Sequence, residues 1–260
     1  MGQDTKYVVP GLDRGLRLLS LFNKQEAELT LTEINRRMQT PYATTYRLLH
    51  TLELHGLLHK TKVGFRLGPG ILRLGYQYLS SMDLVEIARP VLVQLRDSTR
   101  GSANLGVMDG ADVVYIAHVP STQAIATRFE VGSRMVAHSS SIGRLLLGAM
   151  PRENVRRMFK GNGLKRPDGS RHRSIDDLVT SAQRDEKRGY VITKGAYHPG
   201  IIAVAAPIFD RSGTPVAGLN VSGLASDWDS KLIEGRIKDQ VCAAAHSVSK
   251  LLGHQHKASK

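Results

Sequence analysis

The stretch from Thr40 to Gly56 carries side chains that could read a DNA sequence. On a helical wheel its leucines gather on one side, and Arg47 and His50 lie on the other. Arginine can make a two-donor contact with guanine, whereas Thr, Tyr and His reach phosphates or other base edges. We therefore predict that helix 41–55 enters a major groove. The predicted contacts from this stretch are Thr40, Tyr42, Ala43, Thr44, Thr45, Tyr46, Arg47 and His50.

A second polar group, near the C-terminus, could hold a small molecule. In the sequence VAGLNVSG, strand alternation places Gly218, Asn220 and Ser222 on one face. Asn220 and Ser222 supply donors and acceptors beside a glycine that leaves space, which is an arrangement suited to the floor of a pocket. Alternation alone favours a face that meets water, so the pocket is one of two interpretations at this point.

Motifs for catalysis are absent from the sequence. There is no Gly-x-Ser-x-Gly elbow, His-Glu-x-x-His pair, phosphate-binding glycine loop or dinucleotide fingerprint. The pair His254 and His256 supplies two metal ligands on a tail, too few for a site. Cys242 is the sole cysteine, so no internal disulfide can form. We expect no catalytic residue, metal or cofactor, and an enzyme with a small-acid site stays as the less favoured alternative.

The elements that would position the predicted DNA-contacting side chains of residues 40–56 form a winged helix-turn-helix. A helix over 12–22 has an apolar stripe, and a second begins at Thr30, which stands in capping-box register with Glu33. Thr40 is expected to cap the third helix, which ends at Gly56. The residues predicted to face the core from the first helix are Leu12, Leu16, Leu19 and Phe22, with Leu18 beside them.

Two short strands follow, with Gly64 at their turn. This small wing carries Lys62 and Arg66, which we expect to contact phosphates. Leu54 falls on the polar side of the third helix and is predicted to pack under the wing. Another helix covers 69–81.

The rest of the chain alternates strands and helices. An Asp109-Gly110 pair between apolar runs predicts a hairpin, and a turn at 210–213 predicts another. Strand 124–132, a helix capped by Ser139 or Ser140, a helix ending at Gly189 and a closing helix over 229–252 complete the pattern. The fold class is α+β. The predicted domains are a DNA-binding domain at 1–80, a linker helix at about 80–88, an effector domain at 89–253 and a flexible tail at 254–260.

Composition and charge limit the classes of function. The net charge of +13 favours a polyanionic partner. No apolar run approaches the roughly 20 residues that span a bilayer, and no signal peptide opens the chain, so we expect a soluble cytoplasmic protein without a membrane partner. A non-specific nucleic-acid binder remains an alternative. It would need stacking aromatic residues, and only 5% of the residues are aromatic.

Several runs carry a resemblance to a known family. LDRGLRLLSLF, PYATTYRLLHTLELHGLL and FRLGPGILRLG in the first part, and VGSRMVAHSSSIGRLLLGAM and AVAAPIFDRSGTPVAGLNVSG in the second, resemble the IclR family of bacterial transcription regulators. The resemblance covers nearly the whole chain. It implies a winged helix-turn-helix, a linker helix and an effector domain of GAF-like fold. It also implies a homodimer or dimer of dimers on a palindromic operator, with an organic or aromatic acid as signal.

The resemblance also implies which residues hold the effector. Backbone amides at the start of the helix expected within 139–150 would meet a carboxylate. The sequence departs from glyoxylate sensors, because Ala203 and Asn220 replace residues typical of them and no carboxylate follows Tyr190; Lys194, His198 or Arg128 could receive an anion instead. The predicted effector residues are Arg128, Ser140, Ser141, Ile142, Gly143, Thr193, Ile201, Ala203, Asn220 and Ser222.

Overall fold

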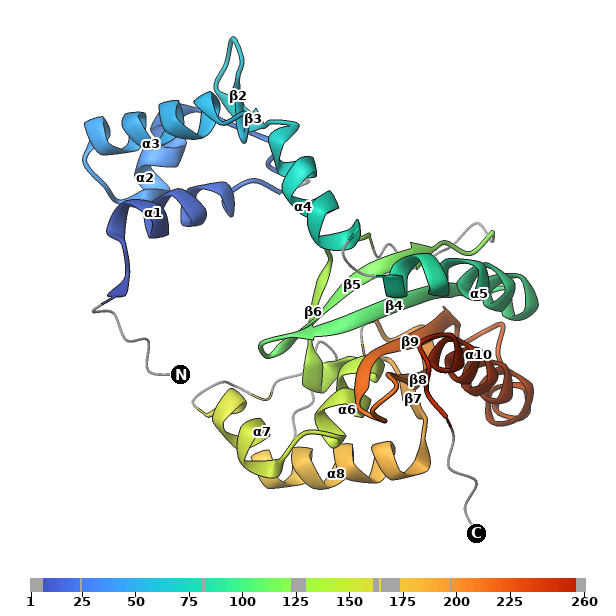
Figure 1. Ribbon diagram of the computed structural model, residues 1–260. Coiled ribbons are helices and arrows are strands. Elements are labelled where there is room, and N and C mark those ends of the chain that lie inside the picture. Colours follow the sequence, from blue (N-terminus) through green and yellow to red (C-terminus); the bar gives the residue numbers. More distant parts are fainter. Residues whose placement is uncertain are drawn as a thin grey trace. The chain divides into compact units, whose positions relative to one another are not determined.

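The computed structural model describes residues 7–23, 25–80, 83–122, 130–160, 164, 174–196 and 198–255. The chain divides into two compact units, Met1–Ser81 and Met82–Lys260. Figure 1 labels the helices and strands of both units.

The first unit is a small helical domain with a three-stranded sheet. Its core joins Leu18, Ile34, Leu49, Leu58 and Phe65, each from a different element. The sheet has the antiparallel order β1-β3-β2. The elements are α1 (Pro10–Leu19), β1 (Glu28–Leu29), α2 (Leu31–Met38), α3 (Tyr42–Leu54), β2 (Leu58–Lys60), β3 (Phe65–Leu67) and α4 (Gly70–Ser80). The predicted helix-turn-helix and wing are therefore present, and the short strand β1 was not predicted.

Two sequence signals explain where the helices of this unit begin and end. Thr30 and Glu33 form the predicted capping box at the start of α2, each side chain accepting from the other residue's backbone N–H. Gln39 adopts a left-handed conformation at the break. The N-cap of α3 is Pro41 and not Thr40, so that predicted cap is wrong. Gly56, with φ of 70°, allows the chain to leave α3.

The predicted stripe on α1 is partly wrong. Leu12 and Leu16 are 62% and 57% exposed, whereas Leu18 is fully buried. The helix ends at Leu19, so Phe22 enters the core from a turn and does not continue the helical spacing. Leu54 is 76% exposed, so its predicted packing under the wing is wrong too.

The second unit is built around one six-stranded antiparallel sheet. The strand order is β6-β5-β4-β9-β8-β7, so the hairpins β4–β5 and β8–β9 meet at the pair β4–β9. The elements are α5 (Asp83–Thr99), β4 (Ser102–Asp109), β5 (Asp112–Val119), β6 (Arg134–Val136), α6 (Ser141–Gly148), α7 (Arg152–Phe159), α8 (Ile175–Arg188), β7 (Val191–Lys194), β8 (Ile201–Phe209), β9 (Pro215–Leu224), α9 (Ser230–Leu232) and α10 (Lys238–Leu251).

The α+β class and both predicted hairpins are confirmed. Gly110 has φ of 61° at the β4–β5 turn, where Asp109 pairs with Asp112. Ser140 caps α6 by accepting from the Gly143 N–H, and Gly189 ends α8 in a left-handed conformation. The predicted strand 124–132 lies mostly outside the described residues.

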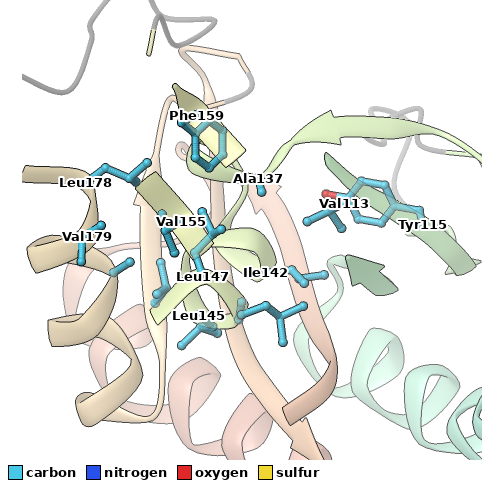
Figure 2. Close-up of a cluster of buried hydrophobic side chains, with 14 residues drawn as sticks. Val113, Tyr115, Ala137, Ile142, Leu145, Leu147, Val155, Phe159, Leu178 and Val179 are labelled. Atoms are coloured by element: carbon cyan, nitrogen blue, oxygen red, sulfur yellow. The ribbon is translucent and has the colours of Figure 1, made fainter. Parts of the chain in front are cut away.

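Helices cover both faces of this sheet. In Figure 1, α5 and α10 lie on one side of the sheet, and α6, α7 and α8 lie on the other. Figure 2 shows the apolar core on the second side, where Ile142 and Leu145 of α6 lie among side chains of the neighbouring elements. Gly218 makes this packing possible, because a Cβ there would come within 2.8 Å of Ile142 Cγ2. The start of α6 is therefore held tightly over the middle of the sheet.

Candidate DNA-reading helix and effector cavity

The outer face of α3 presents the predicted DNA-reading side chains. Tyr42 and Tyr46 are 58% and 50% exposed, and Ala43, Arg47 and His50 are exposed as well. On the opposite face Leu49 is fully buried, so the division of the helix into an apolar and a polar side is as predicted. Two large aromatic rings and an arginine held away from the core are free to contact a partner of this unit.

Thr45 does not belong to that face. Its side chain is fully buried, and its hydroxyl donates to Asn35 Oδ1 at 2.8 Å. The Thr40 hydroxyl lies 2.8 Å from the Thr45 hydroxyl. The prediction that Thr45 contacts DNA is wrong, because this hydroxyl joins α2 to α3 across the turn. Thr40 is half-buried in the same network, and Thr44 is half-buried on α3.

The wing places its cations at the surface. Lys62 is exposed in the tip between β2 and β3, and Arg66 is exposed on β3. Arg66 stands opposite His59 on β2 and Glu28 on β1 in the sheet register. Gly64 is required at the tip, since a Cβ there would lie 2.2 Å from the Leu29 carbonyl oxygen. The tip is thus fixed against β1 while Lys62 stays outside.

An ion pair beside α2 gives the first unit a predicted sensitivity to acid. Arg37 donates to both carboxylate oxygens of Glu26 and lowers the pKa of Glu26 to about 2, from 4.5. Because the folded-state pKa is the lower one, ionised Glu26 stabilises the unit above pH 4.5, and this contribution is lost as the pH falls toward 2. Thermal unfolding followed by circular dichroism across this pH window should show the loss. Glu26→Gln should flatten the dependence, and an unchanged slope would contradict the assignment.

The second unit contains a cavity between the sheet and the start of α6. It is small, about 20 Å³, which is room for about one water molecule. Six predicted effector residues line it together with four that sequence reasoning missed. The predicted six are Ser141, Thr193, Ile201, Ala203, Asn220 and Ser222, and the additional four are Tyr115, Met135, Ser139 and Ala196.

Sheet register explains how residues distant in sequence meet in this cavity. Ser222 of β9 stands opposite Ala203 of β8, which stands opposite Thr193 of β7. Asn220 lies two residues from Ser222 and so points to the same face. Tyr115 and Met135 come from β5 and the short edge strand β6. No local pattern marks that strand as a neighbour of the cavity, which is why these two residues were not predicted.

Three predicted effector residues serve α6 itself. The Ser140 hydroxyl caps the helix, and the Ile142 side chain is buried in the apolar core. Gly143 lies where a Cβ would come within 2.3 Å of the Ala137 carbonyl oxygen. Their side chains do not line the cavity, and the Gly143 N–H already donates to the Ser140 hydroxyl. Arg128 lies outside the described residues.

The cavity lining carries no charged side chain among the residues the structure describes. Lys194 is exposed and, as the strand neighbour of Thr193, points to the opposite face of the sheet. His198 is exposed in the loop after β7, where its Nδ1 accepts from the Gly200 N–H at 3.4 Å. Neither residue forms part of the cavity, which corrects the prediction that they receive an anion there. Polar recognition in the cavity depends on hydroxyl and amide groups.

A chain of hydrogen bonds runs beneath the cavity. The Asn220 Nδ2 donates to the Ser141 Oγ at 3.1 Å, and the Asn104 Nδ2 donates to the Asn220 Oδ1 at 2.8 Å. His118 Nδ1 lies 2.7 Å from the Asn104 Oδ1. Asn104 and Asn220 are buried, and burial lowers the pKa of His118 against an opposing effect of Glu130. Asn104 and His118 were not predicted, because register and not sequence proximity brings them together.

Comparisons with known proteins match both units. Residues 11–62 match the IclR helix-turn-helix domain, and residues 76–250 match the family described as bacterial transcriptional regulator IclR C-terminal. The second match alone spans more than half of the chain. This protein belongs to the IclR family. The regulator is 32% identical to HTH-type transcriptional regulator BhcR of Paracoccus denitrificans over 251 residues, which are 96% of this chain and 89% of the relative.

Solved structures agree with this assignment. An IclR transcriptional regulator from Alicyclobacillus acidocaldarius is 26% identical with a TM-score of 0.80, covering 95% of this regulator and 100% of that chain. An IclR homologue from Microbacterium hydrocarbonoxydans, complexed with 4-hydroxybenzoate, is 22% identical with a TM-score of 0.78. That match covers 93% of this regulator and 98% of that chain, and at this identity it supports the fold alone.

The family assignment makes the chain a transcriptional regulator with a helix-turn-helix and an effector-binding domain. Its relative BhcR is a transcriptional regulator as well. Within the described residues, no helix is long and apolar enough to cross a membrane. No group of three or more metal-binding side chains occurs in that same part of the chain.

Proposed function

We propose that this IclR-family regulator binds a palindromic operator as a homodimer or dimer of dimers. Its effector is a small organic acid, a class that includes aromatic acids. The exposed polar face of α3 carries the proposal, since Arg47, His50 and two tyrosines stand on the second helix of a helix-turn-helix. Arg47 reads bases. Thr40, Thr44, Lys62 and Arg66 contact phosphates, and Tyr42, Ala43, Tyr46 and His50 contact bases or phosphates.

Replacing Arg47 with alanine should weaken operator binding by about 1–3 kcal/mol and relax specificity at one base pair. The matched control is Arg17→Ala, which removes an exposed arginine from α1. The control should weaken binding to operator DNA and binding to random DNA about equally, because it removes charge without removing base contacts. Fluorescence anisotropy with operator and random duplexes at several salt concentrations measures both. Equal losses for the two variants on both duplexes would contradict base reading and favour a non-specific binder.

The effector part of the proposal is supported by the lining of the cavity. Ser141, Thr193 and Ser222 line the cavity together with Asn220, and the cavity lies at the start of α6, where the first backbone N–H groups favour an anion. An organic acid is larger than the space present, so its entry requires side chains to move. Met135 lines the cavity and has the rotamer freedom to do so. Thr193, Ile201 and Ala203 would line the far side of the bound acid.

Ala203→Leu is expected to abolish the effector response and to leave DNA binding by ligand-free protein intact. The added side chain fills the cavity from β8, between Thr193 and Ser222. The assay is thermal unfolding with a panel of organic acids that includes 4-hydroxybenzoate, because a ligand at 100 times its Kd stabilises by about 2.7 kcal/mol. An undiminished thermal shift in Ala203→Leu would move the effector site elsewhere. Loss of DNA binding as well would show that the variant is misfolded.

A further inference from the structure

The hydrogen-bond chain under the cavity crosses the sheet in one straight row. His118 of β5 stands opposite Asn104 of β4, which stands opposite Asn220 of β9. Residues opposite one another in antiparallel strands point to the same face. That face is the one covered by α6, since Asn220 bonds Ser141 at the start of this helix. A side chain near the sheet edge is thereby linked to a hydroxyl that lines the cavity.

The side-chain amides of Asn104 and Asn220 each bond one neighbour in the row through the oxygen and the other neighbour through the nitrogen. An acceptor on one side of Asn104 therefore requires a donor on the other side, and the same holds for Asn220. The row has only two self-consistent directions. In one, His118 Nδ1 donates to Asn104 and Asn220 donates to the Ser141 oxygen. In the reverse direction, Ser141 donates to Asn220 and His118 Nδ1 accepts.

Burial raises the free-energy cost of a row in which one amide points the wrong way and leaves a polar atom without a partner. Asn104 is fully buried, and Asn220 and Ser141 are each 3% exposed. A buried polar atom without a partner costs on the order of a whole hydrogen bond's desolvation, so the members switch direction together or not at all. The observed arrangement has the Asn104 Oδ1 facing His118 and the Asn220 Nδ2 facing Ser141. It requires a proton on His118 Nδ1.

The direction decides what Ser141 offers to a ligand. When Asn220 donates to the Ser141 oxygen, the hydroxyl proton of Ser141 is not used by the row and is available to the cavity that Ser141 lines. In the reverse direction Ser141 donates that proton to Asn220, and the Ser141 oxygen presents only lone pairs to the cavity. A carboxylate needs donors, so the first direction adds a donor for an anionic ligand and the reverse direction places lone pairs against it.

We propose that His118 is a positioning residue that, through Asn104 and Asn220, makes the Ser141 hydroxyl a donor toward the cavity and so selects effectors that present a carboxylate oxygen there. This inference rests on the proposed effector site. Burial keeps the pKa of His118 below its usual value, so the ring is neutral near neutral pH and must adopt one tautomer. Glu130 is the charged group that acts on it among the described residues.

Nuclear magnetic resonance of the full-length, ligand-free protein tests the tautomer directly. With histidines labelled by ¹⁵N, the Nδ1 of His118 should show the shift of a protonated nitrogen, and His118→Asn assigns the signal by removing it. A neutral ring with its proton on Nε2 would overturn the proposal. This measurement needs no ligand, so it stands independently of whether the effector has been found.

A pair of near-isosteric variants tests the consequence for binding. His118→Asn supplies an N–H donor to Asn104, whereas the carboxylate of His118→Asp can only accept and forces the reverse direction. Affinity for 4-hydroxybenzoate should stay near the wild-type value in His118→Asn and fall about tenfold or more in His118→Asp, as for a lost hydrogen bond to a charged group. Isothermal titration calorimetry measures both.

His198→Asp controls for added negative charge, because it makes the same replacement at an exposed position near Ala196 of the cavity. An equal loss in His198→Asp and His118→Asp, or equal affinities in the two His118 variants, would overturn the proposal. If wild-type protein does not bind 4-hydroxybenzoate, that result counts against this aromatic acid as the effector in the proposed function. The tautomer measurement then decides the inference by itself.

Discussion

Replacing Asp185 with alanine is expected to lower the free energy of unfolding of the second unit by about 3–5 kcal/mol. The Asp185 side chain is 2% exposed and accepts hydrogen bonds from Arg144 of α6 and Arg188 of α8. The Arg144 side chain is 19% exposed, and its Nε is buried without a partner within the described part of the chain. Removing Asp185 therefore leaves a largely buried guanidinium without its counter-charge. That imbalance, and not the loss of attraction alone, makes the effect large.

Two further variants separate a buried ion pair from general damage to α8. Arg188→Ala should cost below about 1 kcal/mol, because the Arg188 side chain is 44% exposed. The double variant Asp185→Leu with Arg144→Met should regain much of the loss, since it removes both charges. Urea unfolding of each variant provides the comparison. A double variant as unstable as Asp185→Ala would show that the uncompensated charge of Arg144 is not the cause of the destabilisation.

Replacing Gly143 with alanine is expected to cost about 3 kcal/mol, at the upper end for overpacked sites, and to abolish effector binding. A Cβ at Gly143 would lie 2.3 Å from the Ala137 carbonyl oxygen and 2.5 Å from the Ala137 Cα. Backbone atoms cannot turn away as a flexible side chain can. The start of α6 must therefore shift away from the turn at 137–139, and Ser141, which lines the cavity, shifts with it.

Gly235→Ala is the matched control for this substitution. Gly235 also lies in a helical segment of the second unit, and a Cβ there would meet nothing within 4 Å. It should be neutral or stabilising by up to about 1 kcal/mol, because alanine restricts the unfolded chain more than glycine does. Thermal unfolding and binding of 4-hydroxybenzoate should be measured for both variants. Equal stability of the two would mean that the close approach at Ala137 relaxes without cost.

Local signals in the sequence predicted the elements well. The Thr30 capping box, the Asp109-Gly110 hairpin and the Ser140 cap act through residues close in the chain, so spacing alone reveals them. Alternation also placed Asn220 and Ser222 on one face correctly, and both line the cavity. Such features depend on backbone geometry that each segment carries by itself.

Features that depend on packing between segments could not be predicted. The predicted stripe on α1 included Leu12 with Leu18 beside it, and only the folded core shows that Leu18 is buried while Leu12 is exposed. Thr45 has the same side chain as Thr44, yet contact with Asn35 makes it structural. The row from His118 to Ser141 needs the register of three strands and the placement of a helix. No sequence spacing encodes that register.

The pairing of β4 with β9 also means that the sheet of the second unit is completed late in synthesis. Asn104 and Asn220 are 116 residues apart in the chain. On the ribosome, the first 81 residues are synthesised and can fold long before β9 has been translated. A nascent or prematurely terminated regulator would then carry a folded helix-turn-helix without a closed sensor. Under the proposed function, DNA binding by such a chain would not respond to the effector until translation passes the end of β9.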